Sequence, residues 1–209
     1  MIDDPIEQQD DEFDEVGAYQ LANLPHDPAQ IFKFATYDID YVASELEQGP
    51  LQAINRMLFV QYFSAIEAYL SDRLIRLVLD EPMAMSALVK HNREWIGEKI
   101  AVTEFASNPN AFCDWVHMRL RELMYHNFVK IDLYYQGALG STIFPDEETK
   151  KILMRFLPLR HDCVHRYGRD HEGRERTISK TDLNELGGAA ERVVNHLEAL
   201  FSARRAKDS

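Results

Sequence analysis

The chain has 209 residues, of which 45% are apolar and 28% charged, as in ordinary globular proteins that bury a core without disulfides. The net charge of −12 comes from residues 1–50, which hold 13 acids and one base, so a nucleic-acid partner for the neutral remainder is not excluded. Two cysteines exclude a disulfide framework and a four-thiolate zinc site, and no secretion signal or uncharged membrane-spanning stretch is expected. We therefore expect a reduced, cytoplasmic protein.

The first third of the chain is predicted to contain an acidic segment and two helices. Residues 1–26 are expected to be a flexible N-terminal segment, because residues 1–16 hold eight acids and few apolar side chains. Asp27-Pro28-Ala29-Gln30 predicts a helix start, and Gly49-Pro50 predicts its end. Apolar residues then recur at helical spacing from Leu51 to Leu79, which predicts a long central helix.

Shorter helices are predicted to follow the long one. They are expected at about 83–90, at about 93–105, after Asn108-Pro109, and over 127–138, where the pattern alone is ambiguous between helix and strand. A loop is expected from Gly137 to Pro145.

The last third is predicted to hold two helices around a polar loop. Asp146 opens a helix that Pro158 should kink and Gly168 should end. Residues 169–178 should form a loop or short hairpin, and about 181–203 the last helix. Almost no segment alternates with period two, so the expected fold class is an all-α helical bundle, with one domain over residues 27–205.

Basic residues concentrate around Leu-Arg-His-Asp-Cys-Val-His-Arg-Tyr-Gly at 159–168. Between Lys150 and Lys180 there are nine bases and four acids, a local net charge of +5. Such a strip suits a phosphate backbone. The alternative is a solvated helix face with pairs such as Asp162–Arg166.

Helical geometry groups three side chains of this segment. His161 and His165 are four residues apart and share one face, and Arg160 lies about 100° away, within reach through its long side chain. Histidine exchanges protons near neutral pH, and a guanidinium can clamp a phosphate and its developing charge. Cleavage of RNA by its own 2′-hydroxyl requires such groups.

Arg160-x4-His165, with polar His161 directly after the arginine, resembles the Rx4–6H signature of the HEPN superfamily. The resemblance is most specific over residues 153–168 and extends more loosely to Ser64-Ala65-Ile66-Glu67-Ala68-Tyr69-Leu70 in the long helix. It implies a dimeric helical bundle and a metal-independent endoribonuclease of a toxin–antitoxin or phage-defence system, with no cofactor.

The resemblance also implies residue roles. His165 would be the general acid or base, Arg160 would stabilise the pentavalent phosphate, and His161 would orient it. Asp162, Arg166 and Tyr167 are possible supporting or regulatory residues. Arg160-x4-His165-x-Tyr167 resembles toxins whose tyrosine is adenylylated by a nucleotidyltransferase antitoxin, although Tyr167 can also simply pack at the helix end.

Other interpretations of these residues remain open. Arg121-x4-His126 and Arg166-x4-His171 also match the pattern, but His126 is interpreted as a structural histidine and His171 as a surface one. His161 and His165 have the spacing of metal ligands, but no third ligand is evident. An inactive scaffold that binds RNA, nucleotide or protein is the third alternative.

Overall fold

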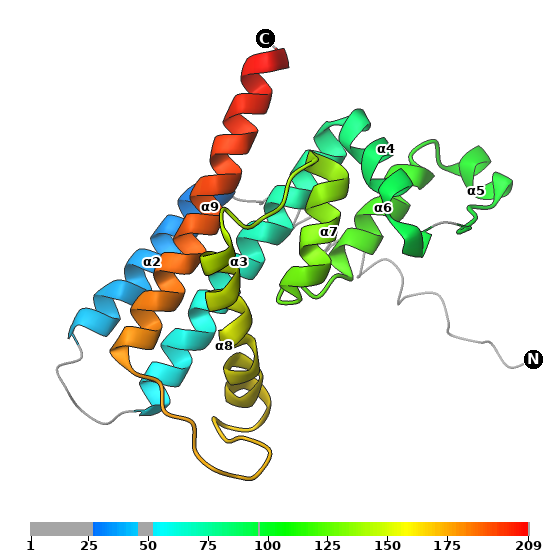
Figure 1. The fold of residues 1–209 in the computed structure, drawn as a ribbon. Helices are drawn as coiled ribbons and strands as arrows, with labels where there is room; N and C mark the ends of the chain where they lie inside the picture. Colours follow the sequence, from blue (N-terminus) through cyan, green and yellow to red (C-terminus); the bar gives the residue numbers. More distant parts are fainter. Residues whose placement is uncertain (1–26, 46–51, 96, 209) are drawn as a thin grey trace, which may run out of the picture.

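The computed structural model describes residues 27–45, 52–95 and 97–208 (Figure 1). The predicted acidic segment 1–26 and the predicted stop at Gly49-Pro50 lie outside the described residues. The described elements are α2 (Pro28–Glu45), α3 (Gln52–Asp80), α4 (Pro82–His91), the 3-10 turn η1 (Arg93–Trp95), α5 (Val102–Ser107), α6 (Ala111–Arg121), α7 (Phe128–Leu139), α8 (Glu147–His165) and α9 (Lys180–Asp208). Apart from one isolated β-bridge, all regular structure in these ranges is helical, which confirms the all-α class.

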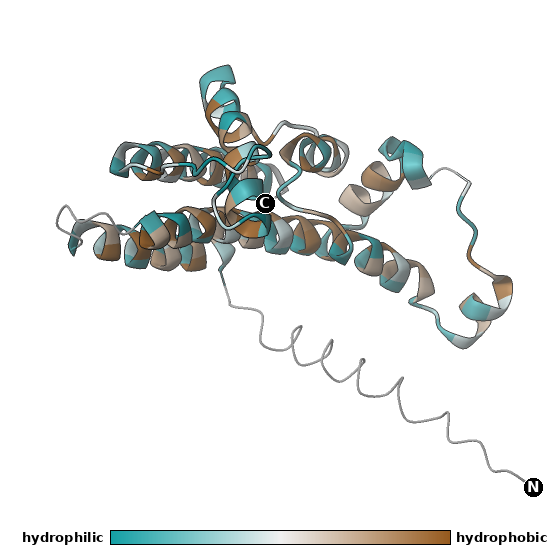
Figure 2. Cartoon of the chain, turned by 90° about the horizontal axis from the view of Figure 1, so that it is seen from below, coloured by the Kyte–Doolittle hydropathy of each residue, from teal (hydrophilic) through white to brown (hydrophobic). Residues whose placement is uncertain are grey.

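Helix α3 is the central element, and α2, α4, α6, α7, α8 and α9 all contact it. Helix α9 runs parallel to it (Figure 1): Gln52 and Asn55 at the start of α3 bond Ile178, just before α9, and Glu81 after α3 pairs with Arg204 near the end of α9. Apolar and hydrophilic residues alternate along the same helices (Figure 2), as expected for helices that each bury one face.

A partly buried ion pair joins α3 to α9. The guanidinium of Arg73 donates from Nε and Nη2 to the two carboxylate oxygens of Glu198, at 2.8 and 2.9 Å. The hydroxyl of Tyr69 donates to the same carboxylate at 2.8 Å, and Arg73 lies over the ring of Phe201. Because removing one member would leave a buried charge unpaired, this pair fixes how the two helices pack.

Several predicted helix boundaries are confirmed. The carboxylate of Asp27 accepts the amide of Ala29, so α2 begins at Pro28 as expected. The predicted central helix corresponds to α3, and the ambiguous segment 127–138 is helical, capped by Asn127. Such helix starts depend on local sequence, because the side chain of one capping residue accepts a hydrogen bond from one free backbone amide of the first turn.

Other boundaries were wrong. No single helix covers 93–105: the chain forms η1, passes Gly97 at a φ of 95°, and resumes as α5 only at Val102. The loop expected from Gly137 begins at Gly140, where the chain turns with a φ of 75°. Helix α8 contains Pro158 but ends at His165, before Gly168, and α9 runs on to Asp208.

Candidate functional site

The C-terminal end of α8 is held by its own backbone. The carbonyl of Asp162 accepts the amides of both Arg166 and Gly168, at 3.0 and 2.9 Å. The two residues after the cap, Tyr167 and Gly168, have left-handed φ values of 58° and 78°. Glycine adopts this conformation freely, but a tyrosine does so only at a cost.

His161 and His165 lie together on the exposed face of this helix end. Their ring centroids are 4.7 Å apart, and both side chains are exposed. Nη1 of Arg166 lies 3.2 Å from Nδ1 of His161. Desolvation, together with nearby Arg166 and His165, lowers the pKa of His161, which favours the neutral imidazole at pH 7.

Asp162 points the other way and is buried. Its carboxylate accepts Nη1 of Arg166 at 2.9 Å and lies 3.9 Å from Nη1 of Arg176. The predicted pair Asp162–Arg166 therefore forms, and it holds the arginine that contacts His161. Asp162 anchors the helix end rather than facing solvent beside the histidines.

Arg160 was expected to reach the face that carries His161 and His165, but it contacts α3 instead. Its Nη2 donates to Oε1 of Glu67 on α3 at 3.2 Å, and its side chain is only 16% exposed. No interaction between Arg160 and either His161 or His165 is seen among the described residues. Nε of Arg160 is buried without a hydrogen-bond partner in this part of the chain.

The segment after α8 forms the expected short hairpin. Arg169 and Glu175 form an antiparallel bridge, and the carboxylate of Asp170 accepts the amides of Glu172 and Arg174. Ile178 is buried and bonds α3 through its amide and carbonyl. The hairpin is thus tied to α3 beside the end of α8.

Ion pairs change how the basic strip presents its charge. Three of its bases contact acids that lie outside 150–180: Lys150 pairs with Glu147, Arg155 with Glu185 and Arg160 with Glu67. Within the hairpin, Arg174 pairs with Asp170 and Glu172. The three pairs with outside acids therefore partly neutralise the local excess, whereas Asp170 and Glu172 are already counted within it.

Two other residues of the motif, Tyr167 and Cys163, differ in accessibility. Tyr167 is 88% exposed, so it does not pack at the helix end as one interpretation held. Cys163 is half-buried, and burial raises the pKa of its thiol, which suits packing rather than nucleophilic chemistry. His171 is exposed in the hairpin, as expected.

Sequence reasoning missed a carboxylate that links the motif to another histidine. Oε2 of Glu67 lies 3.4 Å from Nδ1 of His126, in the turn between α6 and α7, while Oε1 binds Arg160. A glutamate in the apolar pattern of the long helix was the available signal, since a half-buried acid needs a partner. In the described part of the chain, no three His, Cys, Asp or Glu side chains are placed to hold a metal ion.

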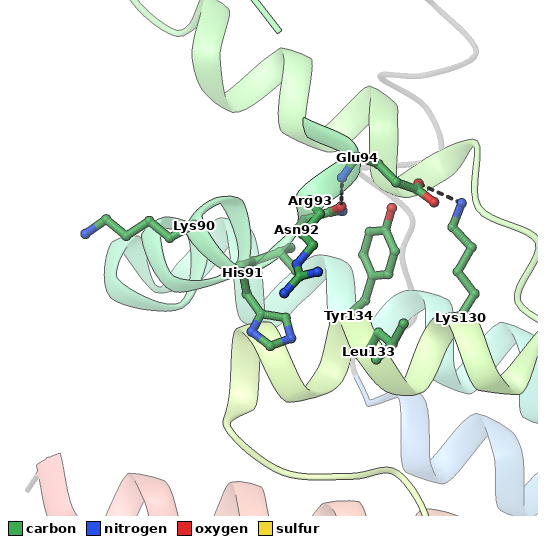
Figure 3. Close-up of a pocket in the computed structure, with 9 residues that line it drawn as sticks. Lys90, His91, Asn92, Arg93, Glu94, Lys130, Leu133 and Tyr134 are labelled. Atoms are coloured by element: carbon green, nitrogen blue, oxygen red, sulfur yellow. Dashed lines mark hydrogen bonds and ion pairs between the residues drawn. The ribbon is translucent and has the colours of Figure 1, made fainter. Parts of the chain in front are cut away.

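A cavity lies away from the α8 motif, between α4, η1 and α7. Figure 3 shows residues of α4 and η1 on one side and of α7 on the other, around a cavity of about 690 Å³. Nζ of Lys130 pairs with Glu94 at 2.8 Å, and Asn92 accepts the amide of Glu94. None of the motif residues of α8 lines this cavity.

Comparison with known proteins gives no match to a family model, to a curated protein or to a solved structure. None of the helices in the described ranges combines the length and apolarity that crossing a bilayer requires.

Proposed function

We propose that this protein is a metal-independent endoribonuclease of the HEPN type, acting as a toxin or phage-defence effector in the cytoplasm. The observation that carries the proposal is the pair of exposed imidazoles, 4.7 Å apart at the end of α8, one of them in contact with Arg166. Arg160, on the same helix, supplies a second guanidinium. Accessible imidazoles beside guanidinium groups are what cleavage of a phosphodiester needs.

The reaction is an attack by the substrate itself. An imidazole accepts the proton of a ribose 2′-hydroxyl as the 2′-oxygen bonds to phosphorus, and a protonated imidazole donates to the 5′-oxygen as its bond to phosphorus breaks. His165 is the acid–base residue, His161 orients the phosphate, and Arg160 stabilises the pentavalent state. Arg166, held by Asp162, supports His161. The products are a 2′,3′-cyclic phosphate and a 5′-hydroxyl.

The active form is proposed to be a homodimer in which two copies of the motif face each other. The helix end presents two apolar side chains beside the histidines: Val164 is 43% exposed and Tyr167 88% exposed. Light scattering coupled to size-exclusion chromatography should give twice the 24.3 kDa chain mass. A monomer that still cleaves RNA would contradict this part of the proposal.

The test is cleavage of a labelled single-stranded RNA in EDTA. Arg160→Ala and His165→Ala should each slow cleavage about 100-fold or more, since proton transfer and charge stabilisation each contribute that much. His171→Ala is the matched control, because it removes the exposed histidine of another match to the pattern, Arg166-x4-His171. Absence of wild-type cleavage, or full activity of His165→Ala, would refute the proposal.

A second candidate is a scaffold that binds RNA, a nucleotide or a protein partner without cleaving. It is favoured by one observation: Arg160 is engaged by Glu67 rather than free beside the histidines. RNA affinity without cleavage would support this function.

Regulation through Tyr167 is proposed as part of the toxin hypothesis. The side chain is almost fully exposed, so a nucleotidyltransferase partner can reach its hydroxyl. Incubation with a cognate transferase and ATP should add one AMP unit to the intact mass. Tyr167→Phe should prevent the addition.

A further inference from the structure

Glu67 connects three segments that are far apart in the chain. One carboxylate oxygen binds Arg160 of α8, and the other lies 3.4 Å from Nδ1 of His126, in the turn before α7. Helices α7 and α8 both pack on α3, the helix that carries Glu67 (Figure 1). A single carboxylate therefore fixes an arginine and a histidine relative to each other.

This contact orients the ring of His126. With Nδ1 beside the Glu67 carboxylate, the Nε2 edge of the imidazole is turned away from Glu67. The side chain of His126 is 33% exposed, against 20% for Glu67 and 16% for Arg160. His126 is thus oriented by a half-buried acid while its ring remains accessible.

The guanidinium of Arg160 has hydrogen-bond donors that its described contacts leave without a partner. In the described residues its one hydrogen bond runs from Nη2 to Glu67, and its buried Nε has none. A guanidinium fixed on one side by a carboxylate, with donors left over, is suited to bind an oxyanion.

We propose that His126, positioned by Glu67, is a second acid–base residue of the site that contains Arg160. The inference rests on the proposed ribonuclease function and deepens it. Cleavage needs one group to take the 2′-hydroxyl proton as the 2′-oxygen–phosphorus bond forms, and another to protonate the 5′-oxygen as it leaves. The chain supplies His126 and His165 for these two transfers, and Arg160 shares a helix with one and a carboxylate with the other.

The experiment measures single-turnover RNA cleavage by full-length variants. His126→Ala should cleave about 100-fold more slowly, within the usual range for loss of a general acid or base, with RNA affinity changed less than about threefold. Glu67→Gln keeps the size of the side chain and should slow cleavage about 10-fold, because the imidazole loses its orienting charge. His91→Ala, which removes the exposed histidine that ends α4 and lies close to Gly137 of α7, is the control and should not change the rate.

Two further variants separate chemistry from structure. His126→Asn retains a nitrogen donor toward Glu67, so it should fold like the wild type and still cleave about 100-fold more slowly. His126→Gly should regain activity when free imidazole is added, which a purely structural histidine would not show. Wild-type-like cleavage by His126→Ala, together with an inactive Arg160→Ala, would overturn this inference alone, whereas an inactive wild type would overturn it and the proposed function together.

Discussion

The two faces of the C-terminal half of α8 differ in what they contact. On the inner face, Arg160 binds Glu67 and buried Asp162 binds Arg166. On the outer face, His161 and His165 are exposed and contact mainly each other and Arg166. The inner face fixes the helix end in place, and the outer face leaves the proton-exchanging groups accessible.

This difference gives the inner-face residues a structural role and the outer-face residues a role in the proposed chemistry. Changes on the inner face should reduce both stability and the proposed activity, because they break the contacts that hold the helix end to α3 and to the hairpin. Changes on the outer face should reduce activity alone, since surface substitutions away from such contacts seldom alter stability. Each prediction below tests whether this separation holds.

The largest effect on stability is expected at Asp162. Asp162→Ala should lower the free energy of unfolding by about 2–4 kcal/mol, because Arg166 and Arg176 lose their shared carboxylate at the helix end. His165→Ala should stay within about 0.5 kcal/mol of the wild type. Urea unfolding measures both. Asp162→Asn still accepts a hydrogen bond and should lose less than Asp162→Ala; equal losses for His165→Ala and Asp162→Ala would break the comparison.

Gly168, directly after the helix, should show the next largest effect. It has a φ of 78°, and a Cβ there would overlap the Arg56 side chain, which pairs with Glu175. Gly168→Ala should cost about 1–2 kcal/mol, because the end of the Arg56 side chain must also shift, whereas Gly173→Ala, at the same φ but in open space, should cost about 1 kcal/mol for conformation alone. Thermal unfolding of the two variants isolates the contact with Arg56. Equal losses of stability for the two variants would show that Arg56 of α3 does not constrain the turn at Gly168.

Tyr167 should behave in the opposite way. Its side chain is almost fully exposed and its φ is 58°, so it gains little from burial and has a strained backbone. Tyr167→Gly should raise the free energy of unfolding by up to about 1 kcal/mol by relieving that strain. Tyr167→Phe keeps the strain and should leave stability unchanged. Destabilisation by Tyr167→Gly would mean that the ring packs against the protein in solution.

Local sequence signals predicted most of the helices because each signal acts within a few residues. The cap at Asp27, the apolar spacing of α3 and the acid at Asp146 each satisfy or bury groups in their own helix. The segment 93–105 failed because its apolar spacing is helical, while Gly97 adopts a left-handed φ that interrupts the helix.

The candidate site was predictable only in part. The spacing of His161 and His165 correctly indicated a shared face, because a four-residue separation is a property of one helix. Glu67 as the partner of Arg160 was not predictable, since the two residues are 93 positions apart and their contact depends on how α8 packs on α3. The charge of the strip was overestimated for the same reason: its neutralising acids come from other helices.

The smallest expected effect concerns the titration of His161 on the outer face. Its pKa is lowered from the ordinary 6.5 by desolvation, by Arg166 and by His165. Arg166→Met removes a positive charge that disfavours the imidazolium, so the midpoint seen by NMR should rise toward 6.5. Arg169→Met, which removes a guanidinium bonded to the Gly173 carbonyl instead, is the control.

The same shift has a defined sign for stability. Because the folded-state pKa of His161 lies below the unfolded value of 6.5, protonation favours the unfolded chain. This contribution to stability is present above pH 6.5 and is lost as the pH falls from there through the lower folded-state pKa. His161→Asn should abolish the loss of unfolding free energy that protonation of His161 causes at low pH. Arg166→Met should make that loss smaller. If the His161 midpoint does not move in Arg166→Met, then Arg166 serves Asp162 alone, and the inner and outer faces of α8 are electrostatically independent.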